Sequence, residues 1–268
     1  MKVVLRKLLI VVGILLVIAA VAVSSFPHYF ISFFEIKKVE LVGETDHISP
    51  MHFKRSLGNT VEGNFFDIDL EAIRMAALGA PWVKEASVHK VWPNRIRIRI
   101  KEHRALALWE DGRLVSVEGI LFAANPDEAE NSTDLPEFFG PADRVRDVTR
   151  RYKRFSQMLK TVIPEAKVTE LSVSDRDSWT LAIASKKIPP TRIELGTEQS
   201  DWTLEDRFGV VIVQYPEVVA LMKGAPSSID ARYENAFSAT LPENALKRLP
   251  SKDNRRREAE VVAERYRQ

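Results

Sequence analysis

The side chains that most often carry out catalysis are sparse in this chain, and none of them has a catalytic spacing. All five histidines lie in the first 103 residues, and no two have the HExxH spacing of a zinc-protease helix. There is no cysteine, which excludes disulfides, thiolate metal sites and cysteine nucleophiles. A Gly-x-Ser-x-Gly turn, a Walker loop and a dinucleotide-binding glycine motif are also missing. We therefore expect no enzyme activity, no catalytic residue, no metal site and no cofactor.

The charged residues are almost balanced, with 39 lysines and arginines against 37 acidic residues. This balance gives no reason to expect a nucleic-acid partner. Adjacent carboxylates such as Glu205 and Asp206 can be found in any chain with 37 acidic residues, and they would indicate glycosidase chemistry only in a cleft. Basic side chains recur on one face of a strand expected over residues 95–101 and of a helix expected over residues 143–161. Solvated faces explain both patterns, with an anionic polymer or an acidic partner as the alternative.

A long apolar run near the N-terminus determines where the rest of the chain is located. The 19 residues from Leu8 to Phe26 carry no charge, and as a helix they would be roughly 28 Å long, close to the thickness of a bilayer core. Three basic residues precede the run, which places the N-terminus in the cytoplasm and the body of the chain outside it. We predict a single transmembrane helix over residues 8–28.

The alternative for the apolar run is a signal peptide cleaved near residues 20–22, where the side chains are small. The run exceeds the usual apolar length of about 7–15 residues in signal peptides, which favours an uncleaved anchor. Aromatic side chains follow the run, as they do at membrane interfaces. They are Phe26, Tyr29, Phe30, Phe33 and Phe34.

Two further patterns predict an α+β body. Over residues 34–102, a strand, two short helices and a hairpin give the order β-α-α-β-β; the helices begin after Ser49 and after Asp67 or Asp69. The second hairpin strand alternates strictly between isoleucines and basic residues, which predicts one buried and one solvated face. Residues 103–241 predict a mostly antiparallel β domain with flanking helices.

Three segments near the C-terminus decide the details of the second domain. Within residues 202–222, the run Val210–Val213 favours a strand, because β-branched residues lose side-chain freedom in helices. Residues 228–233 alternate, which predicts that Ile229, Ala231 and Tyr233 share one side of a strand. The charged tail predicts a disordered segment or a solvated helix that contributes little to folding.

Three stretches are distinctive: the apolar run, Val91-Trp92-Pro93-Asn94-Arg95-Ile96 and Asp230-Ala231-Arg232-Tyr233-Glu234-Asn235-Ala236-Phe237. With them, residues 34–102 resemble a POTRA domain, and nearly the whole chain, to about Thr240, is similar to the FtsQ/DivIB family of bacterial cell-division proteins. The resemblance implies a helix at residues 202–222 that ends on Tyr215-Pro216. It also implies a cytoplasmic N-terminus (1–7), a transmembrane helix (8–28), a POTRA domain (34–102), a β domain (103–241) and a charged tail (242–268).

The resemblance further implies a non-enzymatic divisome scaffold in the cytoplasmic membrane at the division septum, with its C-terminus in the periplasm. The implied partners are the periplasmic segments of FtsB and FtsL, bound by strand addition at the last sheet edge, together with other divisome membrane proteins. The implied contact residues are Arg232, Tyr233, Asn235 and Phe237, with a core-facing Tyr233 as the alternative.

Two departures from the family pattern affect this site. Ala236 stands where the family commonly has glycine, and Thr197 follows Leu195-Gly196 where the family often has a basic residue. One partner contact is therefore absent or supplied by Arg192. Two other functions stay open. One is a POTRA adaptor for secretion or outer-membrane assembly, which would show tandem POTRA repeats or the amphipathic strands of a barrel. The other is an anchored cell-wall hydrolase, which would need a set of catalytic side chains.

Overall fold

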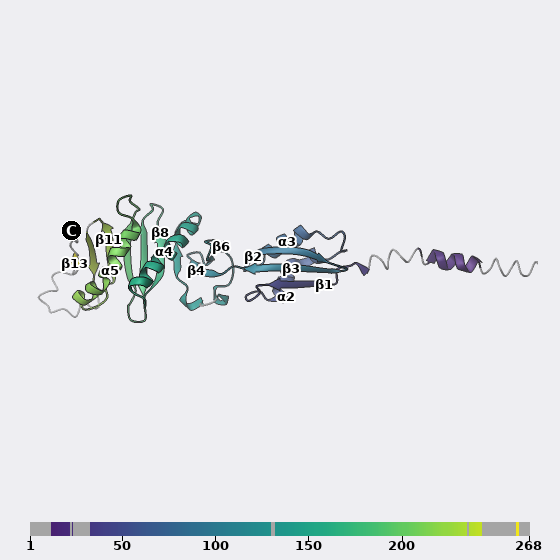
Figure 1. Ribbon diagram of the computed structural model, residues 1–268, viewed down its shortest axis with the longest axis horizontal. Coiled ribbons are helices and arrows are strands. Elements are labelled where there is room, and N and C mark those ends of the chain that lie inside the picture. The colour runs from purple at the N-terminus through teal and green to yellow at the C-terminus, as the bar shows by residue number, and fades with distance from the viewer. Residues whose placement is uncertain are drawn as a thin grey trace, which may run out of the picture. The chain divides into compact units, whose positions relative to one another are not determined.

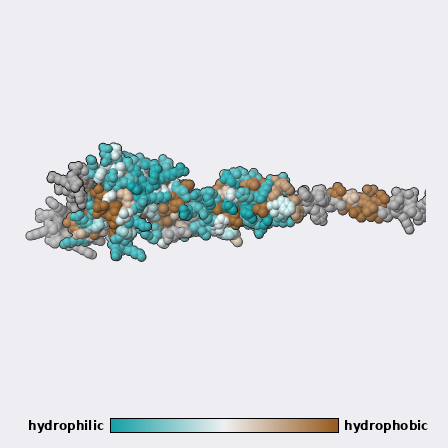
Figure 2. All heavy atoms as spheres, in the orientation of Figure 1, coloured by the Kyte–Doolittle hydropathy of each residue, from teal (hydrophilic) through white to brown (hydrophobic). Residues whose placement is uncertain are grey.

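A computed structural model describes residues 12–21, 23, 33–129, 132–234, 236–242 and 261–262. The chain divides into two compact units, with the boundary between His103 and Arg104. Residues 12–21 and 23 are helical, and their side chains are apolar and exposed (Figure 2). No helix within the described residues is long and apolar enough to span a bilayer. The span expected over residues 8–28 lies partly outside the described residues.

The first unit is a three-stranded sheet with two helices, in the expected order β-α-α-β-β (Figure 1). Its elements are β1 (Lys38–Gly43), α2 (Pro50–Leu57), the 3₁₀ turn η1 (Gly58–Val61), α3 (Leu70–Leu78), β2 (Val83–Val91) and β3 (Arg95–Glu102). The strand order is β1-β3-β2, with β1 parallel and β2 antiparallel to the central β3. Alternation in β3 places three isoleucines in the core and its basic side chains on the exposed face, as predicted.

Local contacts explain why this small sheet is well defined. Asp69 begins α3 by accepting hydrogen bonds from the backbone N–H groups of Glu71 and Ala72. Gly43 has a φ of +112°, and a Cβ there would lie 2.2 Å from the carbonyl oxygen of Ile100, so only glycine fits. On the exposed face, Glu40 accepts hydrogen bonds from Arg95 and Arg97, which partly neutralise the basic strand.

The second unit is a long mixed sheet with strand order β6-β5-β4-β7-β8-β9-β10-β11-β12-β13. Its strands are β4 (Ala105–Trp109), β5 (Leu114–Ser116), β6 (Leu121–Phe122), β7 (Glu137–Phe139), β8 (Lys167–Val173), β9 (Trp179–Ala184), β10 (Thr191–Gly196), β11 (Ser228–Tyr233), β12 (Ala236–Thr240) and β13 (Val261–Val262). Its long helices are α4 (Val145–Val162) and α5 (Leu204–Met222).

The second domain is mostly antiparallel, as expected, but three of its strand pairs in the described residues are parallel: β4–β7, β7–β8 and β10–β11. The reason is connectivity. α4 joins β7 to β8 and α5 joins β10 to β11, and a helical crossover returns the chain in the same direction. Both helices lie against one face of the sheet (Figure 1), where Phe155 of α4 packs on Phe208 of α5 with ring centroids 5.1 Å apart.

The ambiguous segment 202–222 is a helix, and it continues past the Tyr-Pro pair where the resemblance predicted its end. A capping box between Thr203 and Asp206 begins α5, and Pro216 lies inside it. The last turn is retained because Val218 is buried in the core, and its burial offsets the backbone hydrogen bond that proline removes. Helical spacing also buries Val211 and Ile212, so packing overrides the strand preference of the valine run.

Candidate partner-binding edge

The candidate site is the last edge of the large sheet, where β12 pairs with β11 on one side and with β13 on the other. β11 and β12 are antiparallel, with Ile229 opposite Ala239 and Asp230 opposite Ser238. On the outer side, Ser238 pairs with Val262 and Ala239 with Val261, again antiparallel. At these two tail residues the structure has a strand where we expected disorder or a solvated helix. The outer edge of β12 therefore accepts a short extended segment.

A bulge in β11 determines which side chains reach the surface. The register with β12 shifts between Asp230 and Tyr233, so that Tyr233 lies opposite Ala236. The extra residue breaks the alternation that should have placed Tyr233 beside Ile229 and Ala231 in the core. Those two residues are 1% and 4% exposed, whereas Tyr233 is 66% exposed. The core-facing alternative for Tyr233 is therefore wrong.

Charged side chains from β10 and β11 form a network on the open face of this sheet. Arg232 donates to both carboxylate oxygens of Asp230, at 2.9 and 2.7 Å, and its Nε lies 3.7 Å from Glu194. The Arg232 hydrogen bond is the main reason that the pKa of Asp230 is lowered, and Asp230 in turn raises the pKa of Arg232. Arg192 stands beside the network, 4.0 Å from Glu194. An acidic partner would have to share these arginines with carboxylates of the chain.

The structure brings three of the five predicted residues to one exposed region: Arg192, Arg232 and Tyr233. Phe237 is 3% exposed and packs in the core, so only its backbone in β12 is available to a partner. Asn235 lies outside the described residues. Sequence reasoning missed Asp230 and Glu194 as partners of Arg232. The signal was present, because residues two apart on a strand project from the same face.

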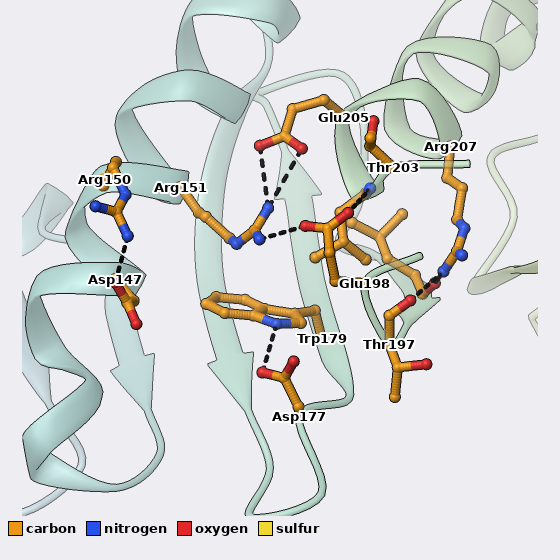
Figure 3. Close-up of polar contacts among 12 residues, drawn as sticks. Asp147, Arg150, Arg151, Asp177, Trp179, Thr197, Glu198, Thr203, Glu205 and Arg207 are labelled. Atoms are coloured by element: carbon orange, nitrogen blue, oxygen red, sulfur yellow. Dashed lines mark hydrogen bonds and ion pairs between the residues drawn. The ribbon is translucent and has the colours of Figure 1, made fainter. Parts of the chain in front are cut away.

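The connection from β10 to α5 is fixed close to this region by a buried arginine. Arg207 is 1% exposed and donates to the carbonyl oxygens of Leu195 and Thr197 (Figure 3). Burial lowers the pKa of its guanidinium. Between these carbonyls, Gly196 has a φ of +77°, and a Cβ there would lie 3.1 Å from Cγ of Arg232. Gly196 therefore lets the connection pass close to Arg232.

A second polar network ties α4 to the start of α5 (Figure 3). Arg151 donates to Glu198 and to Glu205, and its guanidinium lies over the ring of Trp179, 4.9 Å from the centroid. Glu198 also accepts from the backbone N–H of Leu204, the first residue of α5. These contacts use Arg151 inside the domain, so the cations of α4 do not act as one free basic face. Within the described part of the chain, no group of three histidine or acidic side chains could hold a metal ion.

Comparison with known proteins gives consistent matches along the chain. The model of the POTRA domain, FtsQ-type, matches residues 34–103, and that of the cell division protein FtsQ/DivIB, C-terminal, matches residues 107–232. Cell division protein FtsQ of Burkholderia pseudomallei (strain K96243) is 33% identical over 205 residues, which cover 76% of this chain and 79% of that protein. FtsQ of Coxiella burnetii (strain RSA 493 / Nine Mile phase I) is 30% identical over 203 residues, covering 75% and 78%. FtsQ of Bordetella pertussis (strain Tohama I) is 26% identical over 243 residues, covering 86% and 88%.

Proposed function

Because the chain belongs to the FtsQ/DivIB family of cell division proteins, a non-enzymatic family of the divisome, we propose that it is a membrane-anchored scaffold that binds FtsB and FtsL. In this proposal the sheet edge at β12 receives an extended periplasmic segment of the partner. Backbone groups of β12 supply affinity, and the exposed Tyr233, Arg232 and Arg192 supply side-chain contacts. The complex links the partners to septal cell-wall synthesis. Membership of this family argues against both alternative functions, the secretion adaptor and the cell-wall hydrolase.

One observation carries the proposal: β12 already pairs with a second strand, the two tail residues Val261–Val262. The pairing supports strand addition because it demonstrates that the outer edge of β12 is reachable by an antiparallel extended chain. In the described residues, two of the five residues of β12 pair with the tail, so a longer partner strand has more of the edge to gain. Tyr and Arg, the residues exposed beside this edge, are the types most often found as interface hot spots.

The anchor and the location are part of the same proposal. The uncharged run Leu8–Phe26 supports a single span, and the exposed apolar side chains of residues 12–21 and 23 support it further. The N-terminus then lies in the cytoplasm, and the two sheets with their helices lie in the periplasm, at the division septum.

Cysteine cross-linking tests strand addition cleanly, because the chain has no cysteine of its own. Ser238→Cys places one thiol on β12, and single cysteines are then scanned along the periplasmic segment of FtsB. Side chains that face each other across paired strands have Cα atoms within disulfide range. If a strand binds, oxidative cross-links should form at every second partner position, on either side of the partner residue that lies opposite position 238.

The matched control is Ser56→Cys, an exposed serine of α2 in the first unit, which should give no such pattern. Cross-links with a period of three or four partner residues would mean that a helix binds, and strand addition would be refuted. Equal cross-linking from both cysteines would refute the site itself.

A further inference from the structure

Five aromatic side chains gather at one end of the small sheet of the first unit. They are Phe33, Phe34, Phe65, Phe66 and Trp92. Phe34 is buried at the centre, with ring centroids 5.1 Å from Phe33, 5.0 Å from Phe66 and 6.4 Å from Trp92. Around it, Phe33 is 52% exposed, Phe66 58% and Trp92 67%. Three large apolar rings thus share one exposed patch, which we call the aromatic end.

Hydrogen bonds to backbone carbonyls hold the aromatic end in place. The N–H of Phe65 donates to the carbonyl of Phe34 at 2.8 Å, and the N–H of Lys37 donates to the carbonyl of Asn94 at 3.0 Å. Lys90 donates from Nζ to the carbonyl of Phe66, also at 3.0 Å. The start of β1, the loop before α3 and the β2–β3 turn are therefore fixed together. Contiguous exposed apolar side chains on a rigid frame are typical of an interaction surface rather than of scattered surface hydrophobics.

The sequence indicates what covers this surface. Phe33 lies seven residues after Phe26, the last residue of the uncharged run. The seven Cα–Cα steps from Phe26 to Phe33 span at most about 25 Å even when fully extended. If the run crosses the bilayer, the aromatic end is held close to the headgroups. Aromatic rings combined with a lysine at such a distance from a span match the composition of the membrane–water interface.

We propose that the aromatic end of the first unit docks into the headgroup region of the phospholipid bilayer, an inference that rests on the proposed membrane anchor. Phe33, Phe66 and Trp92 insert, while Lys90 stays at the polar level. Exposed Glu35, Glu62 and Asp67 lie in the same segments, so the local charge is mixed and does not select anionic lipids. The driving force is aromatic insertion, and zwitterionic phosphatidylcholine suffices.

Fluorescence quenching of Trp92 tests this inference with the full-length chain. Trp82, Trp109 and Trp179 are at most 2% exposed and Trp202 is half-buried, so Trp92 is the most exposed tryptophan in the described residues. The chain is reconstituted into phosphatidylcholine vesicles that carry a nitroxide either near the headgroup or near the end of the acyl chain. The contribution of Trp92 is obtained by subtracting the fluorescence emission of Trp92→Phe from that of the parent chain. We expect this difference to be lost with the shallow nitroxide and largely retained with the deep one.

Matched variants separate docking from general proximity. Phe66→Ser should restore Trp92 emission in the shallow-labelled vesicles, whereas Met51→Ser, which changes an even more exposed apolar side chain on α2, should not. A chain that co-sediments with the vesicles but shows unquenched Trp92 overturns the inference and leaves the anchor standing. A chain that does not co-sediment overturns the anchor and the inference together. Emission that changes only when FtsB and FtsL are co-reconstituted assigns the patch to a protein partner and also overturns it.

Discussion

Replacing Tyr233 by alanine should weaken the complex with FtsB and FtsL while leaving the fold intact. Aromatic side chains bury about 150–250 Å² each. With 66% of Tyr233 still exposed, about 100–165 Å² is left for a partner to cover. At about 25 cal/mol per Å², this burial contributes roughly 2.5–4 kcal/mol. Immobilising the ring offsets about 0.5–1.5 kcal/mol. The net contribution of roughly 1–3.5 kcal/mol predicts a loss of affinity of about 5- to 400-fold.

The assay is titration calorimetry with the purified periplasmic FtsB–FtsL complex, paired with urea unfolding of each variant. Leu221→Ala in α5 is the matched control, because Leu221 is also 66% exposed but lies in the last turn of a helix, outside the strands β11 and β12. Its affinity should not change, and neither variant should lose more than about 0.5 kcal/mol in free energy of unfolding. Unchanged affinity of a folded Tyr233→Ala chain would refute the assignment. An equal loss in Leu221→Ala would show that exposure alone, rather than position at the edge, had been measured.

Three other predictions concern the same domain. The Thr191 hydroxyl donates to the carbonyl of Pro226 at 2.8 Å and forms a hydrogen bond with the Tyr215 hydroxyl at 2.9 Å. Thr191→Val leaves both of these buried partners unpaired and should lower the free energy of unfolding in urea by about 1–3 kcal/mol. Tyr215→Phe should lower it less. A larger loss in Tyr215→Phe would contradict that order. Because the pKa of Asp230 is lowered in the folded state, its ionisation stabilises the fold fully above the unfolded pKa of about 3.9, and this stabilisation is lost as the pH falls through the lowered folded value. In Arg232→Ala, the urea midpoint should therefore change less with pH in this acid range. Identical pH profiles would show that the pair does not matter. Truncation after Pro242 removes β13 and should strengthen partner binding several-fold if the tail competes for β12; weaker binding would show that the tail is part of the interface.

The pattern of the sequence was sufficient for the first unit because its signals are local. Strict alternation in β3, a proline at the start of α2 and an aspartate cap on α3 each depend on neighbouring residues. The two parallel pairings made by helical crossovers in the second unit depend instead on where α4 and α5 return the chain, which periodicity does not record. The helix at Val210–Val213 was likewise determined by burial against the sheet, against local preference.

The candidate site shows the same division between local and distant information. The family resemblance pointed to Arg232 and Tyr233, but the orientation of Tyr233 depends on a one-residue bulge that arises only when β11 pairs with β12. The same resemblance pointed to Phe237, whose side chain the register of β12 buries. The position of Arg192 beside Glu194 and Arg232 depends on the parallel pairing of β10 with β11, strands separated by the whole of α5.

The pairing of Val261–Val262 with β12 bears on how an exposed edge is kept both protected and available. An uncovered edge strand invites association with other sheets. Within the described part of the tail, two residues pair with β12, and each net hydrogen bond contributes about 0.5–1.5 kcal/mol. Closing a chain loop of about 20 residues costs on the order of 2–3 kcal/mol. These terms nearly cancel, so the tail is a weak cover. A partner strand that gains more pairs and also buries Tyr233 would displace it, whereas a chance encounter with a short extended segment would not.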